Sequence, residues 1–194
     1  MTMSNTDDYL RINELKNYLY CPRISYYGLC LRLDRETHLS SGGIRAEAST
    51  KEKMKRRKGA LHAIHAGERE FDVLVVHEGL RLIGRLDEVV RTAEGVYLVD
   101  YKDTDKDYGY WGVQMMAYRL GMEASGEQVL GSSIYSIPKQ SYTEVKPTSR
   151  QRQQLEEAVQ ALAQMVAMER CPAATDHCGK CQSCQYARFC NDVF

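Results

Sequence analysis

The sequence predicts one α/β domain followed by a cysteine-rich tail. Two observations predict it: helical and strand periods alternate along the chain, and five of the seven cysteines lie in its last quarter, at positions 171, 178, 181, 184 and 190. The 194 residues suffice for one hydrophobic core. The chain has no internal repeat or obvious interdomain linker, so we expect a single domain over residues 1–194.

The N-terminal half reads as helices followed by strands. Apolar spacing over residues 11–30 predicts two short helices separated at Pro22, and residues 44–70 predict a long helix. The period then changes from 3.6 to 2, which predicts a meander of three strands. These strands cover residues 71–77, 80–90 and 96–102, with turns at 78–79 and 92–95.

The C-terminal half continues the alternation. Residues 112–121 predict a helix that ends at Gly121, and Thr148 is a helix cap for residues 148–170. Between these two helices, residues 129–137 and 142–146 predict two further strands.

The composition is that of a folded protein without a global charge. Lys and Arg number 26, as do Asp and Glu, so a nucleic-acid site must be a local patch. The basic run at 51–58 is either such a patch or a solvated face. The N-terminus is polar and has no secretory signal, and no apolar run is long enough to span a membrane. We therefore expect a soluble cytoplasmic protein that does not bind membranes.

The cysteines indicate a metal or iron–sulfur site. Their odd number argues against a disulfide framework, and thiols without a secretory signal should stay reduced. Cys178, Cys181 and Cys184 follow one another at three-residue steps, and this spacing alone favours zinc.

A second group of polar residues lies on the predicted meander. Asp87 is on one strand, while Asp100 and Lys102 share a face at the end of the next. Two converging carboxylates beside a lysine suit Mg²⁺ or Mn²⁺ and phosphodiester hydrolysis. From spacing alone, solvated charges at strand ends are an equally good interpretation.

Residues on neighbouring helices could complete such a site. Gln114 and Tyr118 are four residues apart on one helical face, where they could hold the lysine or a nucleic-acid strand. His62 or His65 could supply an imidazole to the metal. Tyrosines 108 and 110 next to Trp111 would suit stacking on single-stranded bases.

Taken together, these motifs resemble the PD-(D/E)xK nuclease superfamily in its RecB-like branch. With the two cysteine segments added, the chain resembles family four of the CRISPR-associated proteins, the iron–sulfur RecB-like exonuclease of the CRISPR adaptation module. The resemblance covers residues from about 12 to 192. It is carried by YCPR at 20–23, GRLDEV around Asp87, VDYKDT around Asp100 and Lys102, QMMAY from Gln114 to Tyr118, and CQSCQYARFC at 181–190.

The resemblance implies a restriction-endonuclease-like mixed sheet flanked by helices. It implies that Lys102 is catalytic and that Gln114 and Tyr118 support the site and contact DNA. The Mn²⁺ or Mg²⁺ ligands would be His62, Asp87, Asp100 and the backbone carbonyl of Tyr101. Asp100 departs from the glutamate that is usual in this branch. His62 is preferred over His65 because it follows Lys58 and Gly59 as the histidine of the family follows its glycine.

For the cysteines, the resemblance reverses the preference for zinc. It implies a [4Fe–4S] cluster that joins the C-terminal segment to the N-terminal helix. Cys178 is a fourth thiol in the tail and could substitute for Cys21. The ligands implied are Cys21, Cys181, Cys184 and Cys190. The domain would then divide into an N-terminal helical segment (1–30), a nuclease core (44–146), a long helix (147–170) and a cluster-binding tail (171–194).

The function implied is a metal-dependent DNA exonuclease. It would act on single-stranded DNA or overhangs, process prespacers for CRISPR spacer acquisition and work with the CRISPR integrase, and it could form a homo-oligomer. Two alternatives stay open: a non-catalytic DNA-binding scaffold of the adaptation complex, and a RecB-like DNA-repair nuclease outside CRISPR.

Overall fold

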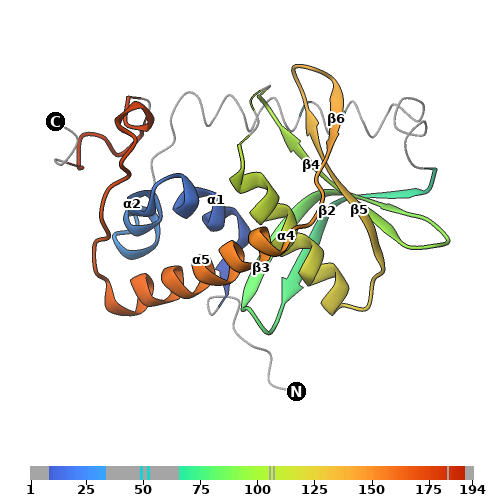
Figure 1. Cartoon of the computed structure of the whole chain (residues 1–194), viewed down its shortest axis with the longest axis horizontal. Coiled ribbons are helices and arrows are strands. Elements are labelled where there is room, and N and C mark those ends of the chain that lie inside the picture. The colour runs from blue at the N-terminus through green and yellow to red at the C-terminus, as the bar shows by residue number, and fades with distance from the viewer. Residues whose placement is uncertain are drawn as a thin grey trace.

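A six-stranded sheet forms one half of the molecule in the computed structural model, and helices extend from it to the other half (Figure 1). The structure describes residues 9–33, 49, 52, 66–104, 106, 108–182 and 184–190. The strands are β1 (Leu10–Arg11), β2 (Glu68–His77), β3 (Leu82–Arg91), β4 (Val96–Lys102), β5 (Val129–Ser136) and β6 (Ser141–Glu144).

The sheet is mixed, as expected. Strands β2, β3 and β4 form the predicted antiparallel meander, and β5 pairs with β6 in a hairpin. The β4–β5 pair is parallel, because α4 (Tyr110–Ala124) carries the chain back to the starting edge. The short strand β1 lies parallel to the beginning of β3.

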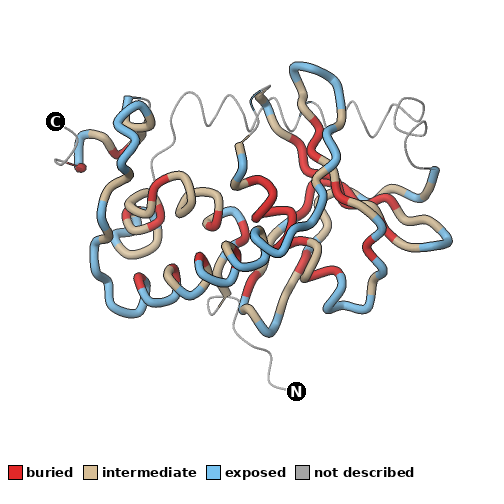
Figure 2. Tube along the Cα trace, viewed as in Figure 1, coloured by how far each residue is buried: buried red, intermediate tan, exposed pale blue. Residues whose placement is uncertain are grey.

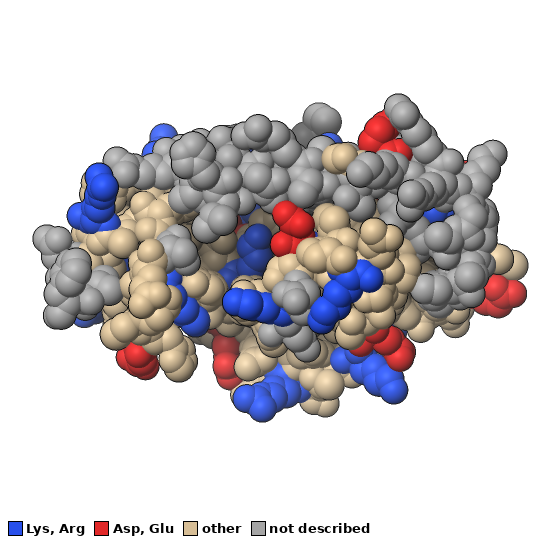
Figure 3. Space-filling view, turned by 90° about the horizontal axis from the view of Figure 1, so that it is seen from above, with Lys and Arg blue, Asp and Glu red and all other residues tan. Residues whose placement is uncertain are grey.

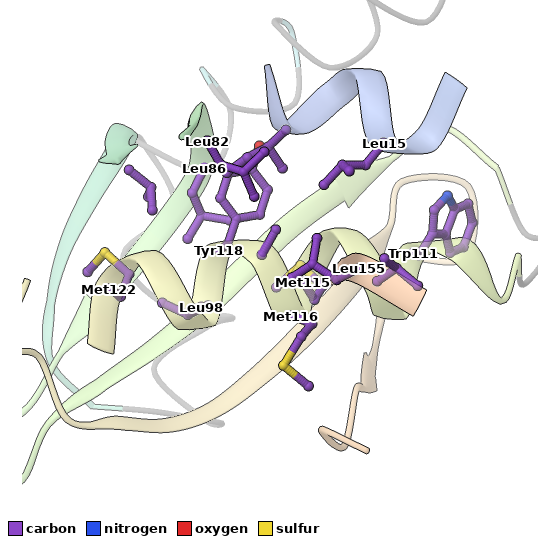
Figure 4. Packing of buried hydrophobic residues seen from close by; sticks show 14 of the residues in the cluster. Leu15, Leu82, Leu86, Leu98, Trp111, Met115, Met116, Tyr118, Met122 and Leu155 are labelled. Atoms are coloured by element: carbon purple, nitrogen blue, oxygen red, sulfur yellow. The ribbon is translucent and has the colours of Figure 1, made fainter. Parts of the chain in front are cut away.

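The remaining helices are α1 (Ile12–Tyr20), α2 (Pro22–Ser25), a π-helical turn (Tyr26–Cys30), α5 (Ser149–Met168) and a 3₁₀ turn (Cys178–Lys180). Among them, α1 and α5 pack on α4, while α2 packs on α1 and on the π-helical turn that follows it. Helix α4 is buried along most of its length, and Figure 2 shows this buried band continuing into the central strands. Leu15 from α1 and Leu155 from α5 are both fully buried against it (Figure 4). No helix among the described residues is long and apolar enough to cross a membrane.

Helix α5 begins where the sequence predicts. The Thr148 side chain accepts a hydrogen bond of 3.2 Å from the backbone N–H of Gln151, and Gln151 Oε1 accepts one of 2.9 Å from the backbone N–H of Thr148. This capping box satisfies two donors at the helix start. The apolar face of α5 is then fixed against α4.

Two expectations about helix ends are wrong. The helix predicted over 44–70 does not reach residue 70, because β2 begins at Glu68; there Arg69 pairs with Glu88, and Glu70 with Arg91, so cross-strand ion pairs support a charged strand. Residues 49 and 52 are helical, and the others from 44 to 65 lie outside the described residues.

The helix predicted to end at Gly121 continues to Ala124. A Cβ at Gly121 would lie 2.4 Å from Cγ1 of Val75. The glycine therefore permits close approach of α4 to β2 and does not end the helix.

Candidate functional site

The strands β3 and β4 separate beside Asp87. Their backbone pairing reaches Glu88 and Val99, and beyond this pair the backbone N–H of Tyr101 donates a hydrogen bond of 2.6 Å to Oδ2 of Asp87. The carboxylate thus satisfies a backbone donor that the neighbouring strand no longer reaches. This contact holds Asp87, which is 7% exposed, next to the end of β4.

Asp100 and Lys102 share one face of β4, as the strand period predicts. Nζ of Lys102 forms an ion pair with Oδ2 of Asp100 and donates a hydrogen bond of 3.1 Å to Oε1 of Gln114. Nε2 of Gln114 in turn donates one of 3.0 Å to Oδ1 of Asn13. A continuous chain of polar contacts from α1 through α4 to β4 therefore positions the Lys102 ammonium.

The two carboxylates are electrostatically coupled. Burial raises the pKa of Asp100 above its usual range and the Asp87 carboxylate raises it further, whereas Lys102 and Lys16 lower it. Oδ2 of Asp100 is buried and faces the Lys102 ammonium. Two buried carboxylates that lie near a lysine fit a hard divalent cation.

The third predicted side-chain ligand cannot be placed against this pair. His62 and the alternative His65 lie outside the described residues. Across the part of the chain that the structure describes, no three His, Cys, Asp or Glu side chains are arranged to hold a single metal ion. Asp87 and Asp100 are thus the two carboxylates brought together by the described residues.

The two predicted tyrosines have structural contacts. The Tyr101 side chain is buried on the opposite face of β4, where its hydroxyl donates a hydrogen bond to the Glu88 carboxylate. Only the Tyr101 backbone therefore belongs to the site. The Tyr118 hydroxyl donates a hydrogen bond of 2.8 Å to the backbone carbonyl of Arg85. Tyr118 is 1% exposed and ties α4 to β3.

Sequence reasoning missed the contribution of α1 to this site. Asn13 is the partner of Gln114, and Lys16 acts electrostatically on Asp100. Residues 13, 16 and 20 recur at helical spacing on one face of α1, and this polar stripe was the available signal.

The cysteines form a second site, at the other end of α1. A small cavity between α2 and the C-terminal tail is lined by Cys21, Cys181, Cys184 and Cys190. Nη1 of Arg23 donates a hydrogen bond of 3.0 Å to Sγ of Cys190, and its Nε donates one of 2.9 Å to the Pro172 carbonyl. Burial and the neighbouring thiols raise the pKa of Cys181, and burial raises that of Cys184. Four thiols around one cavity fit a group that takes four thiolates.

The other cysteines lie apart from this cavity. Cys178 is exposed and does not line it, and Cys171 is exposed beyond the end of α5. The Cys30 thiol is half-buried and donates to the Met165 carbonyl at 3.7 Å. The cavity therefore contains the four cysteines expected from the resemblance and not Cys178.

A family model described as the PD-(D/E)XK nuclease superfamily matches residues 31–191. The CRISPR-associated exonuclease Cas4 of Francisella tularensis subsp. novicida (strain U112) is 26% identical to this chain over an alignment of 197 residues. The alignment covers 99% of this chain and 98% of that protein.

Solved structures share the fold. The crystal structure of SSO0001 covers 100% of this chain and 90% of its own, with a TM-score of 0.55 and 13% identity. The alkaline exonuclease LHK-Exo from Laribacter hongkongensis covers 84% of this chain and 89% of its own, with a TM-score of 0.51 and 13% identity. Its complex with dAMP gives a TM-score of 0.52.

Proposed function

Because this chain belongs to the PD-(D/E)XK nuclease superfamily, we propose that it is a divalent-metal-dependent DNA exonuclease that acts on single-stranded DNA or overhangs. One observation carries the proposal: Asp87, Asp100 and Lys102 meet where β3 and β4 separate. A merely solvated set of charges would be exposed, whereas Asp87 and Asp100 are buried.

In this proposal the two carboxylates bind Mn²⁺ or Mg²⁺, with the Tyr101 carbonyl and His62 as further ligands. When bound, the cation makes a water more acidic and stabilises negative charge on the phosphate. Lys102 places a second positive charge beside the phosphate, and Gln114 keeps its ammonium in position. In the reaction, a water oxygen loses a proton to solvent and bonds to phosphorus, the bond to the leaving oxygen breaks, and that oxygen takes a proton from solvent.

We propose further that Cys21, Cys181, Cys184 and Cys190 hold a [4Fe–4S] cluster. Their position around one cavity supports this set, and the exposure of Cys178 argues against its replacing Cys21. In a tetrahedral zinc site all four thiolates contact one ion, whereas in a cluster each contacts a different iron. The resemblance of the two cysteine segments, YCPR at 20–23 and CQSCQYARFC at 181–190, to those of the iron–sulfur family favours the cluster over zinc.

The biological context proposed is CRISPR adaptation. The relative from Francisella tularensis is named a CRISPR-associated exonuclease, and the match spans almost all of both chains. We therefore propose that the substrates are prespacers, that the integrase is a partner, and that the protein acts in the cytoplasm.

The test is digestion of end-labelled single-stranded and duplex DNA by anaerobically purified protein, with Mn²⁺ or Mg²⁺. Shortening of the labelled strand should vanish in Asp87→Ala and in Lys102→Ala. Glu123→Ala is the matched control, because it removes an exposed carboxylate near the far end of α4 and should cut normally. Cleavage by either site variant at the wild-type rate would refute the active-site assignment.

A further inference from the structure

The geometry points to a subsite for one unpaired DNA nucleotide next to Lys102. A cleft of about 270 Å³ lies between the end of α1 and the segment that leads into α4, and Lys102 is one of its walls. Figure 3 shows a hollow in the face that it views, with a Lys or Arg side chain inside it and both basic and acidic side chains at its rim. This inference rests on the proposed function and names the part of the substrate that the cleft takes.

The cleft has an aromatic wall. Tyr108 and Tyr110 stack with ring centroids 5.3 Å apart and planes at 19°, and Trp111 meets the Tyr108 ring edge-on at 5.2 Å. Tyr20 adds an edge contact to Tyr110 at 6.4 Å. The three tyrosines are only half-buried, so they present ring surface to the cleft. Aromatic surfaces of this kind stack on bases whatever their identity.

The charges of the cleft suit the phosphate of the same nucleotide. Nζ of Lys102 lies 5.9 Å from the Trp111 ring centroid, so the ammonium borders the aromatic wall directly. Lys16 lines the cleft from α1. The acidic Asp103 also lines the cleft, where it is exposed to solvent. A base stacked on the wall places its phosphate next to Lys102, where the proposed cut occurs. A base held in a duplex is already stacked and cannot enter, so the cleft selects unpaired ends.

The wall is held in place without substrate. Nζ of Lys180, from the cysteine-rich segment, donates a hydrogen bond of 2.8 Å to the Tyr20 carbonyl and lies 4.9 Å from the Tyr20 ring centroid. Ile24 lines both this cleft and the cysteine cavity. Such preorganisation lowers the entropy lost when a base binds.

The experiment measures binding separately from cleavage. Fluorescence anisotropy gives the affinity of labelled single-stranded oligonucleotides in EDTA, where no divalent metal supports cutting. One abasic residue is moved stepwise from the end, which removes a base and keeps its phosphate. Because one stacked base contributes about 1–3 kcal/mol, the wild type should bind about fivefold to 150-fold more weakly when the abasic residue occupies the subsite.

The variants assign this loss to the wall. Tyr108→Ala should weaken binding of the intact strand by the same factor and leave binding of that abasic strand unchanged, while Tyr108→Phe keeps the ring and should match the wild type. Tyr97→Ala is the matched control, since Tyr97 is a half-buried tyrosine on the opposite face of β4.

The outcomes separate the two proposals. Equal affinity for intact and abasic strands at every position, or equal behaviour of Tyr108→Ala and Tyr97→Ala, overturns the subsite, even if the protein cuts DNA. If the protein binds bases through Tyr108 but cleaves DNA with neither Mn²⁺ nor Mg²⁺, the subsite is supported and the exonuclease proposal is overturned.

Discussion

Asp87 and Glu88 are adjacent carboxylates in β3, and we expect removal of one to affect cleavage and removal of the other to affect stability. Asp87 faces the proposed metal site, while Glu88 points to the other side of the sheet. Glu88 is fully buried, forms an ion pair with Arg69 and accepts a hydrogen bond from the Tyr101 hydroxyl. Glu88→Ala should therefore destabilise the fold, and Asp87→Ala should abolish cleavage by a folded protein.

The magnitude follows from the burial of the Glu88 pair. The Arg69 side chain is 12% exposed, so Glu88→Ala leaves a nearly buried guanidinium without its carboxylate. Breaking a buried pair in this way costs about 3–5 kcal/mol, out of roughly 5–15 kcal/mol for a typical domain. Glu70→Ala is the matched control, because Glu70 also pairs with an arginine but is 47% exposed. It should cost less than about 1 kcal/mol.

The assay is urea unfolding followed by the fluorescence of Trp111, the single tryptophan of the chain, which is 7% exposed in the fold. With a slope of about 2 kcal/mol/M, Glu88→Ala should lower the unfolding midpoint by roughly 2 M. A midpoint within about 0.5 M of the wild type would refute the structural role of Glu88. A stable Glu88→Ala protein that fails to cut DNA would instead place Glu88 in the active site.

Three further predictions concern the stability of the metal-free protein. Burial raises the pKa of Asp100, so the folded protein retains a proton that the unfolded chain has released, and the free energy of unfolding should fall as pH rises from about 4. Urea titrations across pH should show that Asp100→Asn removes this fall. The same variant should abolish cleavage. Thr148→Ala removes the α5 cap and should cost about 1 kcal/mol in thermal unfolding, whereas Thr148→Ser should not. Gly84→Ala puts a Cβ 2.9 Å from Cβ of Ile12 and should cost about 1–3 kcal/mol by displacing α1, while Gly109→Ala, with open space around it, should be neutral in the same melt.

Much of the fold could be predicted because the sheet follows a simple period. The third strand of the meander runs over 96–102 as predicted, and the nuclease superfamily expected from the motifs is confirmed. Strand β1 could not be predicted, because two residues carry no period and form a strand only where β3 accepts them. Residues 68–70 are charged and were mistaken for helix. They form a strand because Arg69 and Glu70 pair with charged side chains on β3, which the local sequence does not show.

The site was predictable where it depends on local geometry. Strand alternation places Asp100 and Lys102 together, and this contact is observed. The polar stripe on α1 indicated that Asn13 could belong to a site, but its partner could not be predicted, because Gln114 lies 101 positions away in the sequence. His62 and the cluster set stay predictions.

The contacts between the two ends of the chain have a consequence for the order of synthesis. Tyr20 takes its position from Lys180, and Arg23 from Pro172 and Cys190. A domain of this kind generally folds as a unit. A nascent chain that has reached only residue 170 already contains Asp87, Asp100 and Lys102, but it lacks the segment that fixes Tyr20 beside them. We therefore expect the proposed base subsite to be complete only after the cysteine-rich segment has been synthesised.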